Sequence, residues 1–248
     1  LLFFVFYNFN YNNFDNIYVN MDKVVIITGA SKGLGKAITD SVLLRNDTIV
    51  VSISRSIHND HIVFKNKRFH FIKTDLSKPF KINSFKILKK LINQNSQIFI
   101  FNNASVILPI NKVGNFSSFD INYSININIK FPVSLINYMI HTFYTNNINF
   151  INITSGAANK PIAFWSLYSS CKSYMELFFN VLKKENKEVN NLSFISIDPG
   201  TLDTEMQNKI RTNKFPDQDF FLNLKSSNEL VKPAFAAKNI LERIKFSS

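Results

Sequence analysis

The chain alternates between short apolar runs and longer segments in which apolar residues recur with helical spacing. The short runs are rich in β-branched and aromatic residues, which is typical of strands buried on both faces. They span residues 23–28, 48–54, 69–73, 97–101, 147–154 and 192–197, and the predicted helices span 34–45, 82–93, 119–142, 167–187 and 229–245. This alternation predicts βαβ units, and therefore an α/β fold with a doubly wound parallel sheet that binds ligands at the carboxyl ends of its strands.

A single domain is expected from 248 residues, because no internal repeat or linker interrupts the pattern. Residues 1–20 are rich in aromatic residues and asparagine, and the first methionine, Met21, directly precedes the first predicted strand. The initial apolar run is too short to cross a bilayer, and it has neither a basic leader nor a small-residue cleavage site. We therefore predict an N-terminal appendage over 1–20 and a folded domain over 21–248. Because 212–228 shows no strand pattern, we predict a short helical lid around 205–228.

The net charge of +12 could attract nucleic acid or an anionic membrane. The lysines are scattered, however, and no zinc-finger, RNA-binding or basic-zipper pattern is present, so we expect neither partner. The single cysteine, Cys171, cannot form an internal disulfide, which favours a reducing, cytoplasmic location. The four histidines, at positions 58, 61, 70 and 141, lack metal-ligand spacing, so no metal is expected.

Glycine is scarce, and its positions are therefore informative. The chain has 6 glycines, where average usage would give about 17. Three of them, Gly29, Gly33 and Gly35, lie in "TGASKGLG", between the first predicted strand and the first predicted helix. One glycine permits a tight turn, another lets backbone N–H groups approach a pyrophosphate, and a third lets helix and strand pack closely. The segment predicts a dinucleotide-binding loop at a helix N-terminus.

The Gly-x-x-x-Gly-x-Gly spacing resembles the short-chain dehydrogenase/reductase family, and further family motifs follow in order. "NNAS" comes after the fourth strand, with Ser105 where the family has glycine. "FDINYSIN" matches an aromatic-Asp-x5-Asn stretch and places the active-site asparagine at Asn126, while Asn128 fits the spacing less well. "INITSGAA" supplies Ser155, "YSSCK" supplies Tyr168 and Lys172, and "DPGTLDT" supplies a Pro-Gly turn after the sixth strand. The resemblance runs from residue 23 to about 246 and implies a single-domain Rossmann fold whose last edge strand is missing.

The resemblance also implies a nicotinamide dinucleotide cofactor. The matching positions are Gly29, Ser31, Lys32, Gly33, Leu34, Gly35, Arg55, Asp75, Leu76, Asn102, Asn103, Ala104, Tyr168, Lys172, Pro199, Gly200, Thr201 and Thr204. Arg55 stands at the end of the second strand, where an acid would select NAD, so Arg55 and Lys32 favour the 2′-phosphate of NADPH/NADP+. Alternatively, Arg55 is a solvated strand-end residue and Lys32 is part of the general lysine load. Asp75 lies either near the adenine or at a helix cap.

Tyr168 and Lys172 are four residues apart in a predicted helix and therefore one turn from each other. A phenol has a pKa near 10, and an ammonium at about 4 Å in an effective dielectric near 20 contributes roughly 4 kcal/mol, so we predict that Lys172 lowers the pKa of Tyr168 by up to about three units. The resemblance makes Tyr168 the proton donor in carbonyl reduction. It has Ser155 hold the substrate oxygen, Lys172 bind ribose hydroxyls and Asn126 position a proton-relay water. Cys171 is expected to pack.

"KPIAFWSLYSSCK" and "IDPGTLDTEMQNKI" resemble the sepiapterin reductase and benzil reductase branch of the family. This implies NADPH-dependent reduction of a ketone or 1,2-dicarbonyl in a small, planar or aromatic substrate. Substrate contacts are expected at Ser155, Phe164, Trp165, Tyr168 and Met206, although Phe164 and Trp165 could equally pack beneath the lid. Pterins fit less well, because pterin-reducing members carry an anchoring aspartate in a segment beyond the last helix that this sequence does not contain.

Two other functions stay open from the sequence: reduction of 3-oxoacyl thioesters, and dinucleotide sensing without turnover. The Ser155, Tyr168 and Lys172 set argues against sensing, because a sensor needs no proton donor. Family members pair through two long helices, so the resemblance implies a homodimer or homotetramer built on 119–142 and 167–187.

Overall fold

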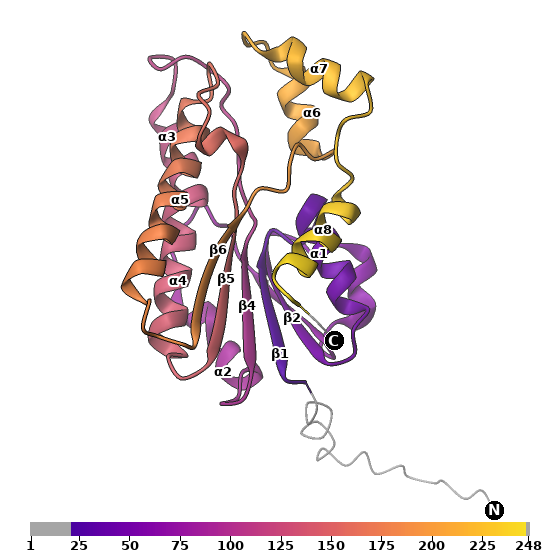
Figure 1. Ribbon diagram of the computed structural model, residues 1–248, viewed down its shortest axis with the longest axis vertical. Helices are drawn as coiled ribbons and strands as arrows, with labels where there is room; N and C mark the ends of the chain where they lie inside the picture. Colours follow the sequence, from indigo (N-terminus) through magenta and orange to yellow (C-terminus); the bar gives the residue numbers. More distant parts are fainter. Residues whose placement is uncertain (1–20, 247–248) are drawn as a thin grey trace, which may run out of the picture.

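The predicted strands form one parallel sheet (Figure 1). The computed structural model describes residues 21–246, so the appendage predicted over 1–20 lies outside the described residues. The strands are β1 (Lys23–Thr28), β2 (Thr48–Ser54), β3 (Phe69–Lys73), β4 (Gln97–Asn102), β5 (Asn147–Ile153) and β6 (Leu192–Ile197). Their order is β3-β2-β1-β4-β5-β6. From β1 to β3 the strands are added on one side of β1, and from β4 to β6 they are added on its other side. This order confirms the doubly wound α/β fold, in which the ligand crevice lies at the carboxyl ends of β1 and β4.

Helices cover both faces of the sheet, which explains why its central strands are apolar throughout. All residues of β2 are buried, as are five of the six in β1. On one face lie α1 (Gly33–Leu43) and α8 (Pro233–Arg243); on the other lie α4 (Phe131–Thr142) and α5 (Ser166–Glu185) (Figure 1). Each face has its own core cluster of buried side chains.

Two helices differ from their predicted extents. The helix predicted over 82–93 is a 3-10 helix, Ile82–Phe85, followed by the short α2 (Leu88–Leu91). Only part of its apolar pattern is buried, since Phe85 and Leu88 are fully covered while Ile82 is exposed. The last helix begins at Pro233 instead of residue 229, because Val231 pairs with Leu202 in an isolated β-bridge and Pro233 is suited to a first helical turn.

The long helix predicted over 119–142 is continuous but has a wider turn in its middle. It consists of α3 (Ser118–Ile125), the π-helical segment η4 (Asn126–Lys130) and α4. Such π-helical turns are often found at functional sites. The predicted lid region contains α6 (Glu205–Thr212) and α7 (Gln218–Ser226), which lie above the carboxyl ends of the strands (Figure 1).

A row of polar side chains crosses the buried part of the sheet. Asn102 in β4 donates a hydrogen bond to Asn152 in β5 at 2.9 Å, and Asn152 donates to Ser196 in β6 at 3.1 Å. The three residues are direct partners in the strand register. Because Asn152 is fully buried, its amide depends on these bonds.

Candidate active site

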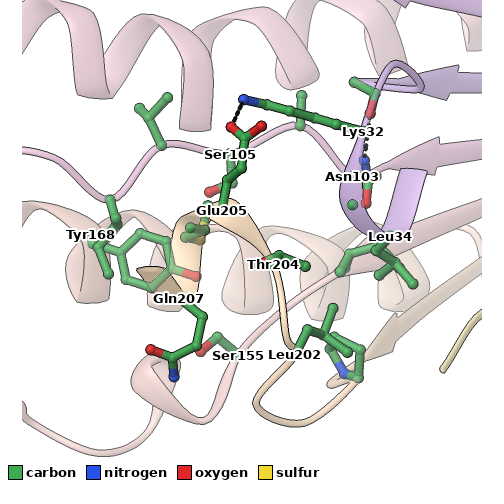
Figure 2. A pocket seen from close by; sticks show the side chains of 18 of the residues that line it. Lys32, Leu34, Asn103, Ser105, Ser155, Tyr168, Leu202, Thr204, Glu205 and Gln207 are labelled. Carbon is green, nitrogen blue, oxygen red and sulfur yellow. Dashed lines mark hydrogen bonds and ion pairs between the residues drawn. The ribbon is translucent and has the colours of Figure 1, made fainter. Parts of the chain in front are cut away.

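A cavity of about 1190 Å³ lies at the carboxyl ends of the strands. Its walls come from the segments that follow β1, β2, β3, β4, β5 and β6, together with α5, α6 and α7. Figure 2 shows residues from the glycine loop and from α6 meeting around it. Most of the site residues predicted from sequence line this one cavity.

The glycine loop has the backbone that the sequence predicts. Gly29 and Gly33 have φ values of +73° and +56°, which favour glycine. A Cβ on Gly35 would overlap the carbonyl oxygen of Gly29, so the third glycine allows α1 to approach β1. Asn103 holds the loop from the other side, donating to the carbonyl oxygens of Thr28 at 2.9 Å and Gly29 at 3.3 Å.

The start of α1 is suited to bind the phosphates of a dinucleotide. Lys32 occupies the N-cap position, but its side chain does not cap the helix, and the first turn contains no acidic residue. The N–H groups at this end therefore have no side-chain acceptor, and Ser31, Gly33 and Leu34 line the cavity beside them. These residues fit the pyrophosphate of a nicotinamide dinucleotide.

Arg55 and Asp75 line the cavity just after the ends of β2 and β3. Arg55 is exposed, and it has no ion pair within residues 21–246. Burial raises the pKa of Asp75, but hydrogen bonds from Ser77 and the charge of Arg55 outweigh that effect and lower it. Asp75 lines the cavity, and its position near an adenine stays a prediction. It caps no helix of residues 21–246, because it accepts from the Ser77 backbone N–H at 3.0 Å in a turn and the next helical segment begins at Ile82.

Lys32 lies in the glycine loop, but its ammonium is paired with the Glu205 carboxylate at the start of α6 (Figure 2). The ion pair links the phosphate-binding loop to the lid region, and both side chains are more than half exposed. The Glu205 carboxylate weakens the attraction of Lys32 for an anionic group such as a 2′-phosphate. An anionic ligand would have to compete with Glu205 for the Lys32 ammonium. The sequence did not indicate this pairing.

Ser155, Tyr168 and Lys172 come together on one side of the cavity. Ser155 lies two residues after β5, at the start of the 3-10 turn η5 (Gly156–Ala158), and accepts from the Ala157 backbone N–H at 3.2 Å. Tyr168 and Lys172 are buried in the first turns of α5. A hydrogen bond links the Tyr168 hydroxyl to Ser155, and the Lys172 ammonium lies 5.7 Å from the centre of the Tyr168 ring.

The ionisation of this pair differs from the sequence-based prediction, which had Lys172 lowering the pKa of Tyr168. Burial raises the pKa of Tyr168 to about 12, with the Asp198 charge acting in the same direction and the Ser155 hydrogen bond opposing it. Burial also lowers the pKa of Lys172 to about 8. The prediction was wrong because both groups are desolvated and because Lys172 donates to the Ile153 carbonyl oxygen at 2.7 Å instead of approaching the phenol.

The two candidate asparagines have different surroundings. Asn126 is not among the described residues that line the large cavity, and its side chain donates to the Ser77 carbonyl oxygen at 2.8 Å. Asn128 is buried, accepts from the Ser105 hydroxyl at 2.8 Å and from the Val106 N–H at 3.0 Å, and donates to the Val106 carbonyl. Asn128 therefore ties the loop after β4 to the π-helical segment.

Three other predicted residues also lie outside the cavity lining. Gly35 contacts Gly29 from within α1, Asn102 bonds to Asn152, and Phe164 packs beneath Lys112 with a φ of +70°. Trp165 and Met206 do line the cavity.

The part of the cavity beneath α6 and α7 is lined mainly by apolar side chains. Trp165 stacks on Phe221 of α7 with ring centres 5.1 Å apart, and it meets Tyr168 edge-on at 5.7 Å. Its cluster also contains Ile107, Ile110, Ala157, Ile210 and Phe215. Gln207 of α6 is a polar lining residue in this part that the sequence analysis did not single out. The sequence offered no signal for it, because Gln207, Asn208 and Lys209 are all polar residues between Met206 and Ile210.

A glycine loop at a helix N-terminus, joined in one cavity to Ser155 and to the buried Tyr168 and Lys172, defines a nicotinamide-dependent oxidoreductase of the Rossmann type. The sequence matches the short chain dehydrogenase family over residues 23–214. The chain therefore belongs to the short-chain dehydrogenase/reductase family, whose members use NAD(P).

Two curated relatives are similar over nearly the whole chain. A benzil reductase ((S)-benzoin forming) of Bacillus cereus is 30% identical over 239 residues, which cover 90% of this chain and 96% of the relative. A benzil reductase of Bacillus subtilis is 30% identical over 228 residues, covering 88% and 92%. Among solved structures, the KRED1-Pglu enzyme has a TM-score of 0.76 at 27% identity and covers 87% of this chain and 91% of its own.

Two features are absent from residues 21–246. None of the helices there is long and apolar enough to cross a membrane. In that same part of the chain, no three His, Cys, Asp or Glu side chains are grouped so that they could hold a metal ion.

Proposed function

We propose that this chain is an NADPH-dependent carbonyl reductase that converts a ketone or 1,2-dicarbonyl of a small, planar or aromatic substrate to an alcohol. One observation carries the proposal: Ser155, Tyr168 and Lys172 line the same cavity as the glycine loop, and Tyr168 also belongs to the apolar cluster that contains Trp165. A carbonyl seated there would have its oxygen near two hydroxyls and its apolar body against Trp165. The similarity to benzil reductases supports the same substrate class.

Tyr168, Ser155 and Lys172 each have a separate role in the proposed reduction. Bound NADPH would supply the hydride. Tyr168, with a pKa of about 12, holds its proton at neutral pH and can donate it to the carbonyl oxygen. Ser155 is hydrogen-bonded to that hydroxyl and can also hold the oxygen. Lys172 donates one N–H to the Ile153 carbonyl oxygen, and its other N–H groups can donate to the ribose hydroxyls of the cofactor.

The purified protein should oxidise NADPH with benzil or other 1,2-diketones. Tyr168→Phe removes only the hydroxyl and keeps the edge-on packing with Trp165, so turnover should fall by at least about 100-fold while NADPH binding persists. Tyr174→Phe is the matched control, since Tyr174 is an exposed tyrosine on the same helix. Turnover of acetoacetyl-CoA without diketones would indicate a thioester reductase. NADPH binding with no turnover of any carbonyl would indicate a sensing module.

The preference for NADPH over NADH is part of the proposal and rests on Arg55. A charged hydrogen bond to the 2′-phosphate contributes about 1.5–3 kcal/mol, so Arg55→Ala should weaken NADPH binding by roughly 10- to 100-fold and leave NADH binding nearly unchanged. Lys160→Ala removes another exposed cation from the cavity lining and serves as the control. Equal losses for both cofactors would contradict a 2′-phosphate contact.

We also propose that the protein forms a homodimer or homotetramer. The outer face of α5 exposes large apolar side chains, with Tyr174 at 45%, Leu177 at 66% and Val181 at 43% exposure. Exposed apolar patches of this kind are typical of interaction surfaces. Light scattering after gel filtration should give a multiple of 28.6 kDa, and Leu177→Lys should shift the population toward monomer. A monomeric native protein would contradict this part of the proposal.

A further inference from the structure

Gln207 is a buried amide with nothing to bind it. Its residue is only 2% exposed, and neither its Nε2 nor its Oε1 has a hydrogen-bond partner within residues 21–246. It nevertheless lines the large cavity together with Ser155 and Tyr168. Figure 2 shows its side chain running from α6 toward the Ser155 turn, with the carboxamide beside Ser155.

The position is one where an apolar residue would serve the fold better. Gln207 lies between Met206 and Ile210, and both of these belong to the apolar cluster under the lid. A buried polar group without a partner costs about 1–3 kcal/mol, and native proteins leave few such groups unpaired. A partner supplied by a ligand would offset that cost, which a leucine or methionine at this position would never incur.

The chemistry of the two free atoms limits what that partner can be. Nε2 needs an acceptor and Oε1 needs a donor. A plain diketone satisfies only Nε2, because it carries acceptors alone. A secondary amide or a lactam presents an acceptor and an N–H donor on one edge, and so it can pair with both atoms of a carboxamide.

We propose that Gln207 is a specificity-determining residue that binds a secondary amide or lactam adjacent to the ketone being reduced. This inference rests on the proposed function, because the reacting oxygen is taken to lie at Ser155 and Tyr168. The stacked Trp165 and Phe221 rings provide an apolar wall for the flat remainder of the substrate. The substrate class is therefore a cyclic or aromatic α-ketoamide.

The reaction on such a substrate balances as an ordinary carbonyl reduction. The carbonyl carbon gains a C–H bond from the hydride of NADPH, the C=O π bond opens, and the oxygen takes its proton from Tyr168. The ketone is reduced to an alcohol and NADPH is oxidised to NADP+. The amide edge held by Gln207 is unchanged.

Isatin and N-methylisatin test the inference, because they share a ring and a reactive ketone while only isatin has the lactam N–H. The wild-type protein should reduce isatin with kcat/KM at least about tenfold above that for N-methylisatin. Gln207→Met keeps the length of the side chain, and it should bring the two values within about twofold by lowering kcat/KM for isatin. Asn208→Met, at an exposed position of the same helix, should keep the wild-type preference.

The outcomes separate this inference from the proposed function. Equal use of the two isatins by the wild type, or an unchanged preference in Gln207→Met and in a second variant, Gln207→Leu, would overturn the role of Gln207 while carbonyl reduction stands. Binding to the protein with NADP+ can be followed by fluorescence of Trp165, the chain's only tryptophan. If no carbonyl is turned over but Gln207→Met still abolishes a tenfold binding preference for isatin, the reductase proposal fails and recognition by Gln207 stands. Equal binding of both compounds together with no turnover would overturn both.

Discussion

Lys172 should make the stability of this protein depend on pH in the alkaline range. The side chain is buried, and burial lowers its pKa from 10.5 to about 8. Between those two values the unfolded chain holds a proton on Lys172 that the folded protein has lost. Raising the pH through this window therefore stabilises the folded state, and below about pH 8 the folded protein carries the full cost of a buried ammonium.

The size of the effect follows from the shift. A shift from 10.5 to about 8 corresponds to a cost of about 3 kcal/mol at pH 7 and about 1 kcal/mol at pH 10. Lys172→Met removes this titration and keeps much of the side-chain volume. It also leaves the Ile153 carbonyl without its donor, a loss of about 1–3 kcal/mol that does not depend on pH.

The assay is urea unfolding of wild type and Lys172→Met at several pH values between 7 and 10, without cofactor. The free energy of unfolding of the wild type should rise by about 2–3 kcal/mol relative to the variant across this range, since other titrating groups cancel in the comparison. Lys183→Met, at an exposed lysine of the same helix, should track the wild type. A difference between wild type and Lys172→Met that stays constant from pH 7 to 10 would refute the depressed pKa.

Three further outcomes are expected from substitutions around the cavity. Glu205→Gln frees Lys32 from its ion pair, so NADPH should bind several-fold more tightly in titrations at low salt; unchanged affinity would show that Lys32 does not reach the cofactor. Gly35→Ala places a methyl group against the Gly29 carbonyl, so the melting temperature should fall and dinucleotide binding should be lost, and a variant that melts and binds like wild type would contradict the close helix approach. Asn128→Leu removes the partners of the Val106 N–H and C=O, so the free energy of unfolding in chemical denaturation should fall by about 3 kcal/mol or more. A fall of less than about 1 kcal/mol would contradict the role of Asn128 in holding the loop after β4.

The sheet could be predicted from the sequence because its strands are buried on both faces. The limits of β1, β2, β3 and β6 agree with the apolar runs, while β4 extends one residue further and β5 ends one residue earlier. The helices were less regular, because their ends depend on contacts distant in sequence. The β-bridge between Leu202 and Val231, for example, delays the last helix until Pro233.

The candidate site was predictable where motifs fix the local backbone. Motifs that resemble those of the short-chain dehydrogenase/reductase family identified Gly29, Gly33, Gly35, Ser155, Tyr168 and Lys172, and all of these except Gly35 line the cavity. The burial of side chains, and ion pairs between residues far apart in the chain, could not be predicted from the motifs. The pKa directions of Tyr168 and Lys172 follow from desolvation, and the partners Lys32 and Glu205 are separated by 173 positions in the chain.

The hydrogen-bonded row of Asn102, Asn152 and Ser196 across β4, β5 and β6 disfavours misaligned pairing of these strands. A slip of one position turns every side chain of a strand to the opposite face of the sheet and separates it from its neighbours on the adjacent strands. Sliding β5 by one position would set Asn152 against Phe101 or Asn103 on one side and against Ile195 or Ile197 on the other. Its amide would then lose both of its bonds inside the protein. Sheets with a shifted register are therefore disfavoured, because they bury the Asn152 amide without hydrogen-bond partners. The register depends on these three polar side chains as well as on the apolar core.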